Sequence, residues 1–205
     1  MRTSKSTSAA LGFSVHTGWA ALVAVSRSGA SLTVLDRRRV QMIPGVDRPP
    51  FERPPFVFHA ARELPLDEAE RLVAATEEKA RDKAREAIGE ALEGLRGAGQ
   101  SVAGGVVITA KDPPPQSLES VLRSHSSIHA AEGALYRAAV RRACEELGLP
   151  VLQVGGHELV MRAAHALGLP ASEVPPYLAR VGRTAGPPWT ADQKAASLAA
   201  VLALS

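Results

Sequence analysis

Three apolar, strand-like runs open the sequence, and only short turns that contain glycine separate them. The runs cover residues 9–15, 19–26 and 31–42, and the turns carry Gly18 and Gly29. Glycine lets a short turn reverse the chain, so the runs predict an antiparallel meander of three strands. Because the first run, AALGFSV, is apolar almost throughout, we expect it to be buried on both faces at the centre of a sheet.

The rest of the sequence alternates helical and strand-like segments. A long helix is predicted over 66–95, a short buried strand over 101–110, and a second helix over 125–147 that stops at Gly148. A strand over 150–156 and further helical segments follow. Helical crossovers between the later strands require parallel pairing and right-handed connections. The order therefore predicts an α/β protein in which a mixed sheet has helices on both faces.

A proline-rich segment over 44–65 interrupts this pattern. Its prolines disfavour the interior of any helix or strand, so we expect an irregular surface excursion. With 205 residues, 45% of them hydrophobic, the chain is expected to form one domain over 1–205. Aromatic residues make up only 4%, which argues against a platform of stacked rings that holds unpaired bases.

Cysteine usage and hydropathy bear on the cellular compartment. Cys144 is the only cysteine, which excludes an internal disulfide and a cysteine-rich zinc site. No apolar run is long enough to span a membrane, and the start of the sequence lacks the apolar core of a signal peptide. We therefore expect a cytoplasmic protein without a membrane partner, and the high content of Ala, Arg, Gly and Pro is typical of a GC-rich bacterial genome. The formal net charge of +3 tolerates a polyanion without requiring one.

The predicted order of elements resembles that of the ribonuclease H-like superfamily. Two segments are similar to its Holliday-junction resolvase branch: LGFSVHTGWA over 11–20, where a Gly-Trp pair follows an apolar strand, and the segment over 169–204, which ends in a helix. The resemblance implies a five-stranded sheet in the order 3-2-1-4-5 with strand 2 antiparallel. It also implies a centre of clustered carboxylates that holds two magnesium ions and cuts a phosphodiester bond.

The residues at the corresponding positions match that centre only in part. Ser14 stands where the resemblance places the first-strand aspartate. Asp112 follows the fourth strand and Asp192 begins the last helix, as the family pattern requires, but Ala195 stands in place of a companion acid. Since a neutral hydroxyl is a poor substitute for a bridging carboxylate, the resemblance implies a degenerate active site.

A second candidate site begins the helix over 125–147. His125, His129 and Glu132 stand at i, i+4 and i+7, so they share one helix face. Two imidazoles and a carboxylate suit zinc, manganese or iron better than magnesium, and His129 could also act as a general base. Two further interpretations stay open: a structural helix start whose dipole favours Glu132, or a phosphate site that Arg123 assists without a metal.

These residues lead to three functional hypotheses. If the protein is an enzyme, we expect a metal-dependent phosphodiesterase or nuclease that uses Mg, Mn or Zn. The alternatives are a non-catalytic interaction or scaffold protein, with a homodimer as one form, and a small nucleotide-binding module. The residues expected to handle metal or protons are Asp112, Glu132, Asp192 and His129.

Basic residues supply the candidates for contacts with nucleic acid. The expected phosphate contacts are Arg123, Arg180, Arg183 and Lys194. The run Arg37 to Arg39 alternates faces along a strand, so at most two of its side chains point one way, and we interpret it as a solvated edge rather than a nucleic-acid groove. Trp19 is interpreted as a packing anchor rather than a stacking platform.

Overall fold

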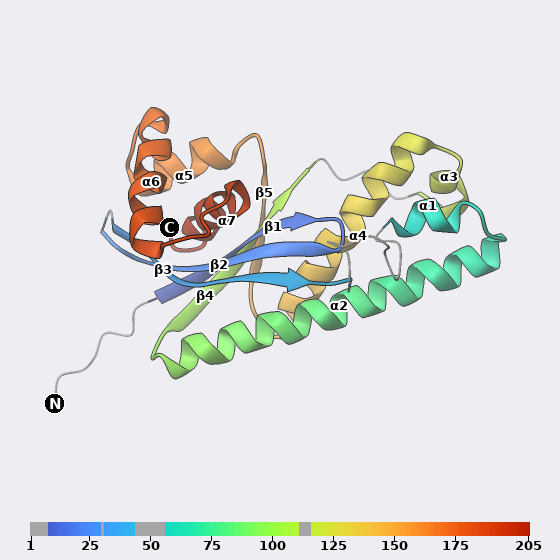
Figure 1. The fold of residues 1–205 in the computed structure, drawn as a ribbon, viewed down its shortest axis with the longest axis horizontal. Helices are drawn as coiled ribbons and strands as arrows, with labels where there is room; N and C mark the ends of the chain where they lie inside the picture. Colours follow the sequence, from blue (N-terminus) through green and yellow to red (C-terminus); the bar gives the residue numbers. More distant parts are fainter. Residues whose placement is uncertain (1–7, 30, 44–55, 111–115) are drawn as a thin grey trace.

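The computed structural model describes residues 8–29, 31–43, 56–110 and 116–205 (Figure 1). The elements in chain order are β1 (Ser8–His16), β2 (Trp19–Ser28), β3 (Ser31–Gln41), α1 (Val57–Ala61), α2 (Leu66–Gly97), β4 (Ser101–Thr109), α3 (Leu118–Leu122), α4 (His125–Glu146), β5 (Val151–Gly155), α5 (Leu159–Leu167), the 3-10 turn η1 (Ala171–Glu173), α6 (Val174–Ala185) and α7 (Ala191–Val201).

The described strands form one mixed sheet. It has five strands in the order β3-β2-β1-β4-β5. β2 is antiparallel to β1 and β3, whereas β4 is parallel to β1 and β5. This topology confirms the predicted α/β class and the strand order that the resemblance implied. β1 lies at the centre as expected, with Ala9, Leu11 and Phe13 fully buried.

Helices cover both faces of the sheet, so the fold has three layers. α2 and α4 lie on one face, and α5, α6 and α7 lie on the other (Figure 1). Neighbouring strand residues point to opposite faces, so Leu22 joins the core beneath α2 and α4 while Val23 joins the core beneath α7. Within the described parts of the chain, no helix combines the length and apolar character needed to cross a membrane.

A helix backbone approaches the sheet closely at Gly12 of β1. A Cβ atom at this position would lie 1.8 Å from the backbone oxygen of Ala196 and 2.7 Å from the backbone nitrogen of Ala200. Glycine therefore allows the backbone of α7 to lie directly on β1. This contact brings the N-terminal turn of α7 to the C-terminal end of β1.

The proline-rich segment contains a buried helix, which corrects the expected irregular excursion. Residues 44–55 lie outside the described part of the chain, but α1 follows them with Val57, Phe58 and Ala61 buried. No proline lies between residues 56 and 64, so the backbone there is free to turn into a helix. α1 packs against α2 and α4 and becomes part of the core.

Substitution of Gly12 tests the contact between β1 and α7. We expect Gly12→Ala to destabilise the fold by about 3 kcal/mol or more, because two backbones would have to separate. Gly94→Ala is the matched control: Gly94 is exposed inside α2 with nothing within 4 Å of an added Cβ, and alanine there should stabilise by up to about 1 kcal/mol. Urea unfolding of both variants measures the difference, and equal stabilities would contradict the packing described.

Cys144 provides a second test of the core. Its side chain is fully buried, and burial raises the pKa of the thiol to about 12. The thiolate is the reactive form, so the native protein should not react with a thiol reagent at pH 8, and reaction should follow unfolding in urea. Rapid labelling of the native chain would contradict this burial.

Candidate functional site

Polar side chains gather where the C-terminal end of β1 meets the first turn of α7. The hydroxyl of Ser14 donates to Oδ1 of Asp192 over 3.3 Å, and Nε2 of His16 lies 2.7 Å from the same oxygen. We call Ser14, His16 and Asp192 the β1–α7 centre. Ser14 and Asp192, which sequence reasoning assigned to one active site, are therefore in direct contact.

A capping box fixes the start of α7 and with it the position of Asp192. The side chain of Thr190 accepts from the backbone N–H of Gln193 at 3.3 Å, and the side chain of Gln193 accepts from the backbone N–H of Thr190 at 3.0 Å. This reciprocal pair satisfies backbone donors that a helix start leaves free. Asp192 is then held in the first turn, facing β1.

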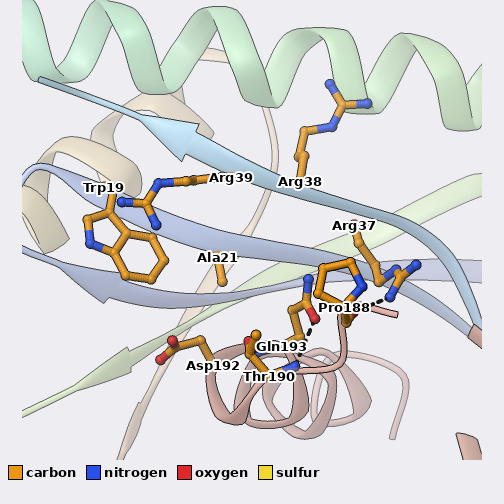
Figure 2. A pocket seen from close by; sticks show the side chains of 9 residues that line it. All are labelled: Trp19, Ala21, Arg37, Arg38, Arg39, Pro188, Thr190, Asp192 and Gln193. Carbon is orange, nitrogen blue, oxygen red and sulfur yellow. Dashed lines mark hydrogen bonds between the residues drawn. The ribbon is translucent and has the colours of Figure 1, made fainter. Parts of the chain in front are cut away.

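A groove of about 510 Å³ opens beside this centre, with arginines along one wall (Figure 2). Arg37 donates to the backbone oxygens of Ala185, Gly186 and Pro188, so its guanidinium holds the segment between α6 and α7 against β3. The groove is lined by Trp19, Ala21, Arg37, Arg38, Arg39, Pro188, Thr190, Asp192 and Gln193.

A continuous series of contacts runs from the arginine wall to Asp192. The guanidinium carbon of Arg39 lies 3.7 Å from the centre of the Trp19 ring, and the His16 ring stacks on Trp19 with 4.3 Å between ring centres. His16 in turn contacts Asp192. Trp19 therefore packs against His16 and Arg39. Arg39 is exposed on the edge strand β3, as expected, and its side chain there lines the groove (Figure 2).

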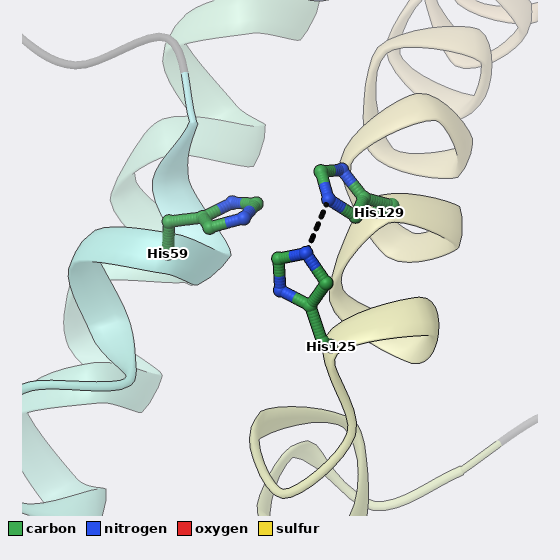
Figure 3. Close-up of side chains that lie close together, drawn as sticks. All are labelled: His59, His125 and His129. Atoms are coloured by element: carbon green, nitrogen blue, oxygen red, sulfur yellow. Dashed lines mark hydrogen bonds between the residues drawn. The ribbon is translucent and has the colours of Figure 1, made fainter.

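A second group of polar side chains, which we call the histidine cluster, consists of His59, His125 and His129 (Figure 3). His59 comes from α1, and the other two come from the first two turns of α4. One ring nitrogen from each residue lies within 4.8 Å of the others, and the Nε2 atoms of His125 and His129 are 3.0 Å apart. The helical spacing did bring His125 and His129 together, and α1 adds the third imidazole.

Glu132 lies behind the histidine cluster rather than among its ligand nitrogens. Its carboxylate accepts from the backbone N–H groups of Val57 at 3.1 Å, Phe58 at 2.8 Å and His59 at 3.3 Å. Oε1 also lies 3.3 Å from Nδ1 of His59. Burial raises the pKa of Glu132 even though these hydrogen bonds act in the opposite direction. The expected alignment of Glu132 with His125 and His129 as a third ligand is corrected: the carboxylate caps α1.

Comparison with known proteins rests on structure, because no protein-family model matches the sequence and no curated protein is similar to it. RuvC from Thermus thermophilus, solved in complex with Holliday junction substrate, has a TM-score of 0.53 at 15% identity, over 95% of this chain and 90% of the RuvC chain. Another T. thermophilus RuvC structure has a TM-score of 0.52 at 15% identity, over 95% and 92% of the two chains. The fold is ribonuclease H-like.

In this ribonuclease H-like fold, the β1–α7 centre departs from a two-magnesium site. Asp192 is the one carboxylate that the described residues bring to the centre, and its Oδ1 already contacts Ser14 and His16. Ala195 provides no ligand, and Asp112 lies outside the described residues. Two magnesium ions require several hard oxygen ligands, which the described part of this centre does not offer.

The four basic residues predicted to contact phosphate are not among the residues that line the groove. Arg123 is the C-cap of α3 and pairs with Glu119. Arg180 and Arg183 are exposed on α6, and Lys194 is half-buried on α7. The sequence analysis interpreted Arg39 as part of a solvated edge and did not foresee its contact with Trp19. The hairpin register indicates this contact, because Trp19 pairs with Gln41 and residue 39 is then diagonally opposite on the same face.

Introducing a second carboxylate tests the composition of the β1–α7 centre. Ser14→Asp would place two like charges in contact, so we expect a lower melting temperature without metal and a rise when Mg²⁺ is added. The double variant Ser14→Asp/Asp192→Asn is the control and should not respond to Mg²⁺. The melting temperature of the wild type should also stay constant in Mg²⁺. A clear rise would contradict the claim that the β1–α7 centre has too few carboxylates to bind Mg²⁺.

Proposed function

We propose that this protein binds the sugar-phosphate backbone of nucleic acid along the groove beside the β1–α7 centre, without two-magnesium cleavage. The observation that carries the proposal is the guanidinium of Arg39, held over Trp19 at the groove, with Arg37 on the same face of β3. The bound Holliday junction in one of the RuvC structures supports DNA as the partner of a chain with this fold.

The charges of the groove favour phosphate at its Arg39 end. Arg38 points toward α2, where it pairs with Asp36 and Glu90, and Arg39 donates to the side chain of Gln41. Asp192 would repel phosphate, and it lies at the opposite end of the contact series from Arg39. A phosphate is therefore expected to bind beside Arg39 rather than beside the carboxylate.

The Trp19 ring acts in this proposal as a support and not as a stacking surface for a base. His16 and Arg39 both lie within stacking distance of the ring, and two such groups must occupy its opposite faces. A base would have to displace one of them. Recognition should therefore depend on the phosphate backbone and be largely independent of base sequence.

Hydrolysis has no support among the described acids, because Glu132 and Asp192 lie in different sites. Asp192 belongs to the β1–α7 centre, whereas the carboxylate of Glu132 is occupied by the backbone of α1. His129, the expected general base, contacts His125 in the histidine cluster. A binding role requires none of these groups to act together.

Fluorescence anisotropy with a four-way DNA junction and a matching duplex tests this function. We expect binding that weakens steeply as salt rises, since phosphate contacts release counterions. Arg39→Ala should weaken binding about tenfold, as expected for one charge-assisted hydrogen bond, and should lower the salt dependence by about one counterion. Arg71→Ala removes an exposed arginine on α2 that pairs with Asp67, and this control should bind normally.

Three results would overturn the proposal. The first is no binding of either DNA at low salt, which would favour the interaction or scaffold hypothesis. The second is normal binding by Arg39→Ala, which would move the contact surface away from the groove. The third is cleavage of the junction in Mg²⁺ or Mn²⁺ by wild-type protein, provided that Asp192→Asn abolishes it.

A further inference from the structure

We propose that His59, His125 and His129 form a binding site for a divalent transition metal ion, with Zn²⁺ as the best match. This site differs from the β1–α7 centre in place and in chemistry. In Figure 1, α1 and the first turns of α4 lie beyond the strand ends, on the side away from α7. Its described ligands are imidazole nitrogens, where the ribonuclease H-like centre would use carboxylates.

The geometry of the histidine cluster is close to that of a metal site. Zinc binds histidine nitrogen at about 2.0–2.1 Å in a tetrahedral arrangement, which separates the ligand nitrogens by about 3.3 Å. The Nε2 atoms of His125 and His129 are already 3.0 Å apart, and the cluster as a whole lies within 4.8 Å. Small side-chain rotations would close the remaining distance. Without metal, a hydrogen bond between neutral imidazoles accounts for the short contact.

Glu132 supplies the support that metal-binding histidines usually have. When Nδ1–H of His59 donates to Oε1 of Glu132, Nε2 of His59 keeps its lone pair for a metal. The same carboxylate accepts from the backbone of α1, so it fixes both the helix and the ring that the helix carries. Glu132 is only 2% exposed, so water does not compete for the hydrogen bonds that its carboxylate accepts.

The three imidazoles of the histidine cluster favour some metal ions over others. Three imidazoles suit zinc and neighbouring late transition metals, whereas magnesium prefers oxygen ligands. His125 and His129 are exposed, so a fourth coordination position would face solvent and take water. A bound ion would also join α1 to α4 and thereby stabilise the helix within the proline-rich segment.

To test this site, metal is first removed from the full chain with a chelator. Zn²⁺ binding is then measured by titration calorimetry and thermal melting. We expect one Zn²⁺ per chain and a rise in melting temperature, and Mg²⁺ should have no effect. His59→Ala, His125→Ala and His129→Ala should each weaken Zn²⁺ binding at least tenfold. His165→Ala removes an exposed histidine on α5 and should bind Zn²⁺ normally. Co²⁺ should give the visible absorption of a tetrahedral site in the wild type and lose it in His129→Ala.

Two results of the Zn²⁺ experiments would contradict this site. Binding that survives all three cluster substitutions, or no saturable Zn²⁺ binding by the wild type, would overturn the site. His125 and His129 are exposed, so a folded variant is expected, and circular dichroism verifies it. The result is independent of the proposed function, since Arg39→Ala should retain Zn²⁺ binding while losing affinity for DNA.

Discussion

The backbone of α7 lies directly on β1 at Gly12, and the arrangement of the β1–α7 centre follows from this contact. Because no side chain separates the two backbones, the first turn of α7 reaches the end of β1. The capping box then holds Asp192 against Ser14 and His16. A bulkier residue at position 12 would move the helix outward and separate the carboxylate from the strand. The polar centre is thus a consequence of backbone packing on the buried face of a central strand.

The protein has two polar sites that are built on different principles. The β1–α7 centre joins Ser14 and Asp192, two residues that the sequence resemblance assigned to an active site, but it brings one carboxylate among the described residues and borders a groove with Arg37 and Arg39. The histidine cluster depends on a buried carboxylate, Glu132, which the chain uses to hold a short helix and one imidazole. Burial of a charge is costly unless hydrogen bonds satisfy it, and α1 supplies three backbone donors.

Much of the fold follows from the sequence, because apolar runs and glycine turns define strands locally. The strand order came from the resemblance, and the helix period correctly placed His125 beside His129. The periodicity of α4 could not show which element would cover Glu132, since that depends on α1, a helix inside the segment whose prolines predicted irregular structure. His59 escaped notice for the same reason. The role of Asp112 and the phosphate contacts of Arg123, Arg180, Arg183 and Lys194 stay predictions.

Anomalous diffraction from one crystal soaked in Mn²⁺ and another soaked in Zn²⁺ distinguishes the two kinds of metal site. Mn²⁺ binds where oxygen ligands form a magnesium site, and Zn²⁺ binds to imidazole nitrogens. We expect a Zn²⁺ peak among His59, His125 and His129 and no pair of Mn²⁺ peaks at the β1–α7 centre. Two Mn²⁺ peaks beside Ser14 and Asp192 would contradict this expectation, because the chain would then assemble the two-metal centre that its described carboxylates do not provide.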